Sequence, residues 1–317
     1  MKKVLITGIS GFAGGHLLKH LTGKDYEIFG TYLYLDNLKR LNTSRKVNLS
    51  KIDLRKDKEV YTLIEKVKPD IIFHLAALPS SSDSFNQPQE TIVNNVSPQI
   101  NILESLRKLN LTDCIVLVIS SAEIYGKVSK ENLPIDEETP FNPTNPYAVS
   151  KLTQDFLGLQ YFLSYNLRVI RVRPFNHIGP GQSLGFVVSD FAEKIARIEK
   201  GKAKPILSVG NLEAKRDFTD VRDMVRAYGL AVEKGIPGEV YNIGSGKSYK
   251  ISEILKILLS FSKEKIIVRV DKSLFRPVDN PELVCDPSKF IRQTGWTHEI
   301  EIEKTLKDTL DYWRNII

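Results

Sequence analysis

Short apolar runs alternate with amphipathic segments along the first half of the chain. The runs are rich in Val, Ile, Leu and Phe and have the length of strands. The predicted strands lie at 3–7, 27–33, 51–54, 70–77, 114–120 and 167–173. The predicted helices lie between them, at 11–21, 58–68, 90–110 and 147–165. Because continuous apolar strands separated by helices are typical of βαβ units, the sequence predicts an α/β fold with a parallel sheet.

The pattern changes after the segment RPFNHIGPGQ (173–182), where glycine and proline cluster. Beyond it we predict longer helices and fewer strands. A predicted helix at 218–235 and a predicted strand at 239–244 are expected to return to the sheet. The rest of this half is expected to form a second, smaller α/β domain. The predicted domain ranges are 1–175 with 216–246, and 176–215 with 247–317.

The composition is that of an ordinary globular protein, with 42% hydrophobic and 26% charged residues among 317. The apolar run near the start stops at Thr7, so we expect no signal peptide, and no run is long enough to span a bilayer. Cys114 and Cys285 form neither a disulfide framework nor a metal-ligand spacing, so we expect a reducing cytoplasm and no metal. The net charge of +7 comes without a basic block, so we expect no nucleic-acid partner.

The segment GISGFAG (8–14) follows the first predicted strand and opens a helix. Gly8, Gly11 and Gly14 have the spacing GxxGxxG. Glycines at such a turn let a pyrophosphate approach the helix N-terminus, where free N–H groups and the helix dipole favour anions. The alternative is a flexible turn without a ligand. Because strand, turn and helix follow one another in the required order, we predict a dinucleotide site.

The residues after the second strand leave the type of dinucleotide open. An acidic residue there would suit NAD, and an arginine would suit the extra phosphate of NADP. The chain offers Tyr32 and Leu33, and Asp36 only later. Asp53, near the end of the third predicted strand, either accepts a hydrogen bond from adenine or caps the following helix.

Tyr147 and Lys151, in the segment YAVSK, lie four residues apart and therefore on one face of a helix. An ammonium beside a phenol favours the phenolate, so the tyrosine can transfer a proton near neutral pH. Ser121 ends a predicted strand and is expected to hydrogen-bond the reacting oxygen. A YxxxK pair also arises by chance in helices. The glycine turn upstream and the strand end that carries Ser121 favour the redox interpretation here.

Glu123 lies two residues after Ser121, in SSAEIYG (120–126). Two roles are open for its carboxylate. As a base that removes a proton from carbon, it would indicate a dehydratase. As a group that orients a substrate hydroxyl or bonds to backbone, it would suit a reductase.

Five segments together resemble the extended short-chain dehydrogenase/reductase family. They are the glycine turn, HLAA (74–77), SSAEIYG, YAVSK (147–151) and RPFNHIGPG (173–181). The resemblance spans essentially the whole chain. It implies a Rossmann-type, doubly wound domain and a smaller C-terminal domain that binds a nucleotide sugar. Members of this family include epimerases, dehydratases and reductases.

The second half resembles the GDP-4-dehydro-6-deoxy-D-mannose reductases, and less closely the GDP-mannose 4,6-dehydratases. The resemblance implies that the sugar nucleotide is held by Asn176, Lys194, Arg216, Arg276 and Asp279. Arginine suits this role because it makes paired, charge-assisted bonds to phosphate. Alternatively, Arg216 forms a surface ion pair with Asp217, and Lys194 lies exposed on an amphipathic helix. Leu33 stands where these reductases carry arginine, and Asp279 where they carry glutamate.

We therefore predict a nicotinamide-dependent enzyme that reduces the C4 ketone of a GDP-4-keto-6-deoxy-hexose. Tyr147 would protonate the forming alkoxide, and Ser121 would position the oxygen. Lys151 would lower the pKa of Tyr147 and hold the nicotinamide ribose. The alternatives are a GDP-mannose 4,6-dehydratase, a nucleotide-sugar 4-epimerase and a non-catalytic nucleotide-binding protein. The presence of all three residues argues against the last of these.

The cofactor is expected to be NADP or NAD, and the resemblance favours NADP. The residues predicted to bind it are Gly8, Gly11, Phe12, Ala13, Gly14, Tyr32, Asp53, Leu54, Leu75, Ala76, Ala77, Asn95, Tyr147, Lys151 and Pro174. We also predict a homodimer. The helices at 90–109 and 147–165 flank the fold and carry many apolar residues, so a two-fold axis would pair them in a four-helix interface.

Overall fold

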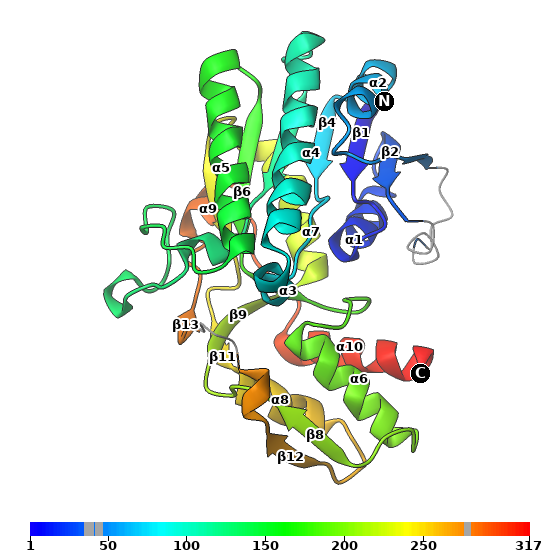
Figure 1. Cartoon of the computed structure of the whole chain (residues 1–317), viewed down its shortest axis with the longest axis vertical. Helices are drawn as coiled ribbons and strands as arrows, with labels where there is room; N and C mark the ends of the chain where they lie inside the picture. Colours follow the sequence, from blue (N-terminus) through cyan, green and yellow to red (C-terminus); the bar gives the residue numbers. More distant parts are fainter. Residues whose placement is uncertain (35–40, 42–46, 276–279) are drawn as a thin grey trace.

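The computed structural model describes residues 1–34, 41, 47–275 and 280–317. Figure 1 shows two parts arranged along the long axis of the molecule. One part is a sheet with helices on both faces, and the other is a smaller group of helices and short strands that ends with the C-terminal helix. Within the described ranges, every helix is too short or too polar to be a membrane span.

Seven parallel strands form the main sheet, in the order β10-β6-β5-β4-β1-β2-β3. They are β1 (Lys2–Thr7), β2 (Tyr26–Tyr32), β3 (Asn48–Lys51), β4 (Ile71–His74), β5 (Ile115–Ile119), β6 (Val169–Pro174) and β10 (Val240–Ile243). The order reverses between β1 and β4, because β2 and β3 extend the sheet to one side of β1 and the later strands extend it to the other. Ligands of open parallel sheets bind outside the carboxyl ends of the strands at such a point.

Helices cover both faces of this sheet. They are α1 (Phe12–Leu21), α2 (Asp57–Val67), α4 (Pro88–Lys108), α5 (Pro146–Tyr165), α7 (Val221–Lys234) and α9 (Ser288–Thr294). The short helix α3 (Ser81–Asn86) packs against α4 and α5 instead. Side chains alternate along each strand. Val4 and Ile6 of β1 therefore join the core beneath α1 and α7, and Leu5 joins the core beneath α2 and α4.

The remaining elements build the smaller part of the molecule. They are β7 (Asn176–Ile178), α6 (Val187–Glu199), β8 (Ile206–Val209), β9 (Lys215–Asp220), β11 (Ser248–Lys250), α8 (Ile251–Ser260), β12 (Ile267–Val270), β13 (Glu282–Leu283) and α10 (Ile302–Ile316). α6, α8 and α10 enclose a second apolar core that includes Phe191, Ile254 and Leu306. β9 pairs with β7, β11 and β13, and β8 pairs with β12.

The predicted fold class is confirmed, since the strand order is that of a doubly wound Rossmann sheet. The predicted third strand is wrong by three residues, because β3 spans Asn48–Lys51 rather than 51–54.

The expectation of fewer strands in the second half is also wrong. β7, β8, β9, β11, β12 and β13 all lie there in addition to β10. The predicted helix at 218–235 begins only at Val221, because Asp220 is its N-cap and accepts a hydrogen bond from the Arg222 N–H at 2.8 Å. The residues before it belong to β9, which lies outside the main sheet, whereas α7 and β10 return to it. Phe290 and Trp296 also join the first core. The domain boundaries stay a prediction.

Candidate active site

The glycine turn between β1 and α1 lies where the strand order reverses. Gly8 has a φ of +67°, and a Cβ there would lie 2.9 Å from the Ala76 Cα, beyond the end of β4. A Cβ on Gly14 would lie 2.3 Å from the Gly8 carbonyl oxygen. Because neither position has room for a side chain, these two glycines let α1 and the end of β4 pack closely against the turn.

Gly11 differs from the other two because a Cβ there would be close to a single atom of the turn. A Cβ at this position would meet only the Gly8 carbonyl oxygen, at 3.2 Å. Gly11 is the N-cap of α1, and the first turn, which includes Phe12 and Ala13, carries no acidic side chain. Its N–H groups and the helix dipole therefore form a site suited to a pyrophosphate.

Ser121, Tyr147 and Lys151 come together at the carboxyl end of β5. Asn145 caps α5 by accepting a hydrogen bond from the Ala148 N–H at 2.8 Å, which places Tyr147 in the first turn. The Ser121 hydroxyl lies close enough to the Tyr147 hydroxyl to affect the pKa of the phenol. The Lys151 Nζ lies 6.0 Å from the centroid of the Tyr147 ring. The structure thus brings all three predicted residues into one site.

Burial is the main influence on the pKa values of Tyr147 and Lys151. It raises the pKa of Tyr147 to about 12, although the nearby Ser121 hydroxyl lowers it, and the charge of Glu123 adds to the increase. Burial also lowers the pKa of Lys151 to about 7. The phenol therefore holds its proton at physiological pH and is available as a proton donor.

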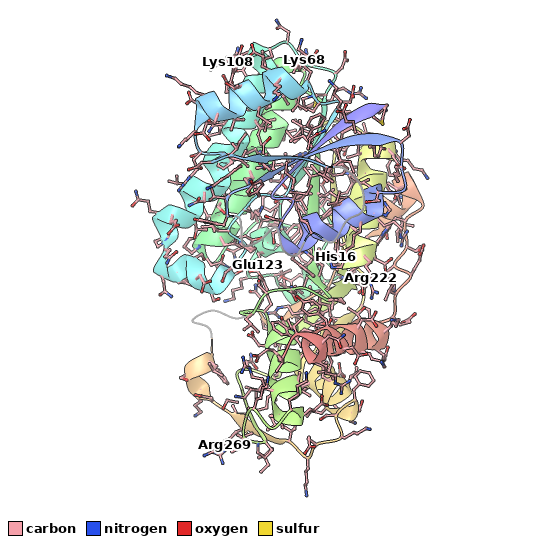
Figure 2. All side chains as sticks on the ribbon, turned by 90° about the vertical axis from the view of Figure 1, so that its right-hand side faces the viewer. His16, Lys68, Lys108, Glu123, Arg222 and Arg269 are labelled. Atoms are coloured by element: carbon pink, nitrogen blue, oxygen red, sulfur yellow. The ribbon has the colours of Figure 1, made fainter. Side chains whose placement is uncertain are left out.

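Glu123 lies beside this group, in a 3₁₀ helix at Ala122–Tyr125 that Ser121 caps. The Ser121 Oγ accepts a hydrogen bond from the Glu123 N–H at 3.2 Å, and the Glu123 Oε2 accepts one from the Asn145 Nδ2 at 3.3 Å. Figure 2 shows Glu123 at the level where the two parts of the molecule meet. Its carboxylate is half-buried and oriented by the residue that caps α5.

The other predicted cofactor residues differ in their burial. Tyr32 ends β2, and Leu75, Ala76 and Ala77 follow β4; all four are half-buried. Leu54 and Pro174 are buried. Asn95 is fully buried, and its side chain bonds to the backbone of Leu78 and to the Ser150 Oγ. Asn95 therefore ties the loop after β4 to α5.

Asp53 is not a helix cap, which excludes one of the two roles considered for it. Its carboxylate accepts hydrogen bonds from the Arg55 guanidinium at 2.9 and 2.7 Å. The N-cap of α2 is Lys56. The role in binding adenine stays a prediction.

Three of the predicted substrate residues lie in described elements of the second half of the chain. Asn176 is exposed at the start of β7, and Lys194 is half-buried on α6. Arg216 is buried and donates to the carbonyl oxygens of Lys215 and Asn280 at 2.8 and 2.7 Å. Because Asp217 is also buried, the alternative of a surface ion pair between Arg216 and Asp217 is wrong. The list is completed by Arg276 and Asp279, which lie outside the described residues.

Two polar side chains that contact the site were not predicted from the sequence. Gln154 accepts a hydrogen bond from the Lys151 Nζ at 2.9 Å, and His74 lies next to Gln154. HLAA contains His74, but its spacing in the sequence gives no indication of a contact with a residue 80 positions away.

A family model described as GDP-mannose 4,6 dehydratase matches residues 5–309. This chain belongs to the GDP-mannose 4,6-dehydratase family. Within it, the chain is 33% identical to GDP-6-deoxy-D-mannose reductase of Pseudomonas aeruginosa, over 99% of this chain and 98% of the relative. The family resemblance drawn from the motifs is thereby confirmed.

Solved structures related to this family have the same fold. The structure of RMD from Pseudomonas aeruginosa complexed with NADPH superposes with a TM-score of 0.87, at 31% identity, with 100% of each chain covered. The crystal structure of Thermus thermophilus UDP-glucose 4-epimerase in complex with NAD has a TM-score of 0.87, at 26% identity, with 99% of this chain and 100% of that chain covered.

Proposed function

We propose that this protein reduces the C4 ketone of a GDP-linked 4-keto-6-deoxy-hexose with a nicotinamide cofactor. The observation that carries this proposal is the meeting of Ser121, Tyr147 and Lys151 beside the glycine turn, at the switch point of the sheet. The name of the Pseudomonas aeruginosa reductase supports the choice of sugar. A panel of nucleotide sugars tests it: NADPH or NADH should be consumed with the GDP-linked 4-keto sugar, and no consumption with any 4-keto sugar would contradict the proposal.

The reaction adds a hydride to C4 and a proton to its oxygen. The nicotinamide supplies the hydride when it is bound. The Tyr147 hydroxyl, protonated at physiological pH, gives its proton to the forming alkoxide. The Ser121 hydroxyl, which lies beside that of Tyr147, holds the same oxygen in place. The ammonium of Lys151 stabilises the phenolate left behind and holds the nicotinamide ribose.

We propose NADP or NAD as the cofactor, with NADP favoured. The relative complexed with NADPH supports NADP, and the epimerase complexed with NAD shows that this fold also accepts the other dinucleotide. Tyr32 and Leu33 provide neither the carboxylate nor the arginine that would decide the matter, and Asp36 lies outside the described residues. A competition titration between NADPH and NADH distinguishes the two.

Replacing Gly11 with valine should abolish cofactor binding and leave the protein folded. The φ of −75° suits valine, and only the Gly8 carbonyl oxygen is near. The side chain would instead fill the space that a pyrophosphate needs. Calorimetry measures the affinity, and circular dichroism checks the fold. Gly15→Val is the matched control, because a Cβ there meets only Leu41, at 3.8 Å. Unchanged affinity in Gly11→Val would refute the assignment.

A dehydratase is the second candidate, because Glu123 stands beside the proton donor. Removal of the C5 proton after oxidation at C4 would need a carboxylate in such a place. The description of the matching family model, GDP-mannose 4,6 dehydratase, also favours this candidate. In a reductase the ketone arrives ready-made, and the Glu123 carboxylate would orient a substrate hydroxyl.

We expect Glu123→Gln to keep most of the rate of ketone reduction. Glutamine retains the acceptor for the Asn145 amide and loses only the charge. The rate of NADPH or NADH oxidation with the 4-keto sugar measures this. A loss as large as that of Tyr147→Phe would show that the carboxylate takes part in the chemistry.

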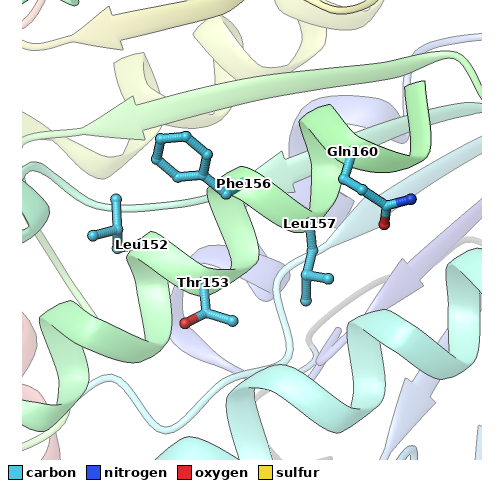
Figure 3. Close-up of a pocket in the computed structure, with 5 residues that line it drawn as sticks. All are labelled: Leu152, Thr153, Phe156, Leu157 and Gln160. Carbon is cyan, nitrogen blue, oxygen red and sulfur yellow. The ribbon is translucent and has the colours of Figure 1, made fainter. Parts of the chain in front are cut away.

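We further propose that the protein is a homodimer joined by α4 and α5. Val149, Phe156 and Leu163 recur at helical spacing on α5 and are 43%, 47% and 69% exposed. Figure 3 shows Phe156 beside Leu152, Thr153, Leu157 and Gln160, which line a pocket on the outer side of that helix. α4 runs beside α5 and exposes Val93 (Figure 1). A two-fold axis through these faces would bury the apolar stripe in a four-helix interface.

Light scattering at micromolar concentration should therefore give twice the 35.9 kDa of one chain. Phe156→Glu should give monomers, because it would place a carboxylate in the apolar interface. Lys200→Glu, on an exposed residue after α6, is the control and should stay dimeric. A monomeric wild-type protein would refute this proposal.

We also propose a cytoplasmic location, which the two buried free cysteines favour.

A further inference from the structure

A row of buried polar side chains connects the lysine of the active site to the carboxyl ends of β1 and β4. Its members, which are all 5% exposed or less, are Lys151, Gln154, His74 and Thr7. The Lys151 Nζ lies 2.9 Å from the Gln154 Oε1, and the Gln154 Nε2 lies 3.4 Å from the His74 Nε2. The His74 Nδ1 lies 2.9 Å from the Thr7 Oγ1. The row therefore runs from α5 to the ends of β4 and β1, the two strands between which the strand order of the sheet reverses.

The lysine determines the direction of every hydrogen bond in the row. In its protonated form Lys151 can only donate, so Gln154 then presents its side-chain carbonyl oxygen to Lys151 and its amide N–H to His74. The His74 Nε2 must then accept, which leaves the proton on Nδ1 to be donated to Thr7. Each group donates to the next, an arrangement in which the bonds polarise and strengthen one another.

His74 can fill this role because it stays neutral. Burial, and next the charge of Lys151, lower its pKa to about 3. At physiological pH the ring therefore keeps an unprotonated Nε2 that accepts from Gln154.

Gln154 also determines which donor of Lys151 is left for a ligand. An ammonium has three N–H donors on a flexible stem. The Ile119 carbonyl oxygen takes one at 2.8 Å, and the Gln154 Oε1 takes another. Both acceptors are fixed, one by the sheet and one by His74, so the head of the lysine cannot rotate freely. The third donor has no hydrogen-bond acceptor within the described part of the chain.

We propose that Gln154, supported by His74, is a positioning residue that holds the Lys151 ammonium in its charged form and leaves one N–H for the bound cofactor. This inference rests on the cofactor of the proposed function but not on its sugar. Burial alone favours the neutral amine. Loss of the Gln154 acceptor would therefore let the Lys151 side chain rotate and would also favour its neutral form.

The test is a double-mutant cycle read by titration of NADPH and NADH fluorescence, without any sugar present. Gln154→Met should weaken cofactor binding about tenfold, the effect of losing one hydrogen bond to a charged group. Lys151→Met should weaken it at least as much. In the double variant, Gln154→Met should add nothing to Lys151→Met, because it acts only through the lysine.

Two further variants separate positioning from packing. Gln99→Met removes another buried amide, which donates to the backbone carbonyl oxygen of Gln154 at 2.7 Å without reaching Lys151, and it should keep wild-type affinity. Gln154→Glu keeps an acceptor for Lys151 and should restore most of the affinity lost in Gln154→Met.

The proposal is overturned if Gln154→Met binds the cofactor like wild type or if the two losses multiply in the double variant. It is also overturned if Gln99→Met does the same damage, or if the wild type binds neither dinucleotide. If the cycle behaves as expected but no 4-keto sugar is reduced, the proposed function fails and the positioning role stands.

Discussion

Tyr147→Phe should lower kcat for reduction of the 4-keto sugar by roughly 10²- to 10⁴-fold, the contribution of a positioned proton donor. The substitution removes only the hydroxyl beside Ser121, and the ring keeps its place in the first turn of α5. Hydride transfer would then leave an alkoxide without a proton source. Steady-state assays give kcat, and titration with NADPH or NADH should show nearly unchanged cofactor affinity.

Tyr161→Phe is the matched control for this variant. Tyr161 lies on the same helix, and its hydroxyl donates to Glu104 at 2.9 Å, away from the active site. Its loss should leave kcat unchanged. If Tyr147→Phe keeps more than a tenth of the activity, another group supplies the proton and Tyr147 is not the general acid.

Asp155→Leu should lower the free energy of unfolding by about 3–5 kcal/mol, the cost of leaving a buried charge without its partner. Asp155 is fully buried, and its carboxylate accepts from the Arg171 Nη1 at 2.8 Å and from the Arg173 Nε at 2.9 Å. Both arginines lie on β6, so the cluster fastens α5 to the sheet. The substitution would leave two buried guanidinium groups without their carboxylate.

Urea denaturation measures this loss. Asp311→Leu is the control, because Asp311 pairs with Arg314 on the exposed side of α10 and such surface pairs contribute about 1 kcal/mol or less. If both variants lose the same amount, water reaches the Asp155 cluster and the buried-charge account is wrong.

The first half of the fold was predictable because its signals are local. β1, β4, β5 and β6 are continuous apolar runs, and the helices between them carry the expected period, so both are visible in any short window of sequence. The order of the sheet followed from the family resemblance, since no local signal places β4 beside β1. β3 was misplaced because it has only four residues, of alternating exposure, at the edge of the sheet.

The short strands of the second half could not be predicted in the same way. β13 has two residues, and β7 and β11 have three each. Segments of this length carry no period of their own and become strands only because β9 offers them a partner.

Residues of the candidate site were likewise predictable only where their signal is local in the sequence. Tyr147 and Lys151 were recognisable because their spacing on one helix is itself the signal. The contact between Gln154 and His74 joins α5 to β4 across 80 positions, and only the folded chain brings them together. The surface ion pair considered for Arg216 and Asp217 is wrong for a related reason. Burial of Asp217 depends on β11 and on the loops around it, which are distant in sequence.

The central claim is that this protein reduces a ketone that is already present in its substrate, and product masses test it most directly. Wild-type protein with GDP-4-keto-6-deoxy-mannose and NADPH or NADH should yield a sugar nucleotide heavier by two hydrogen atoms. The same protein with GDP-mannose and oxidised cofactor should yield no product lighter by one water. A dehydrated product that appears with the wild type and disappears with Glu123→Gln would contradict this account and identify a dehydratase.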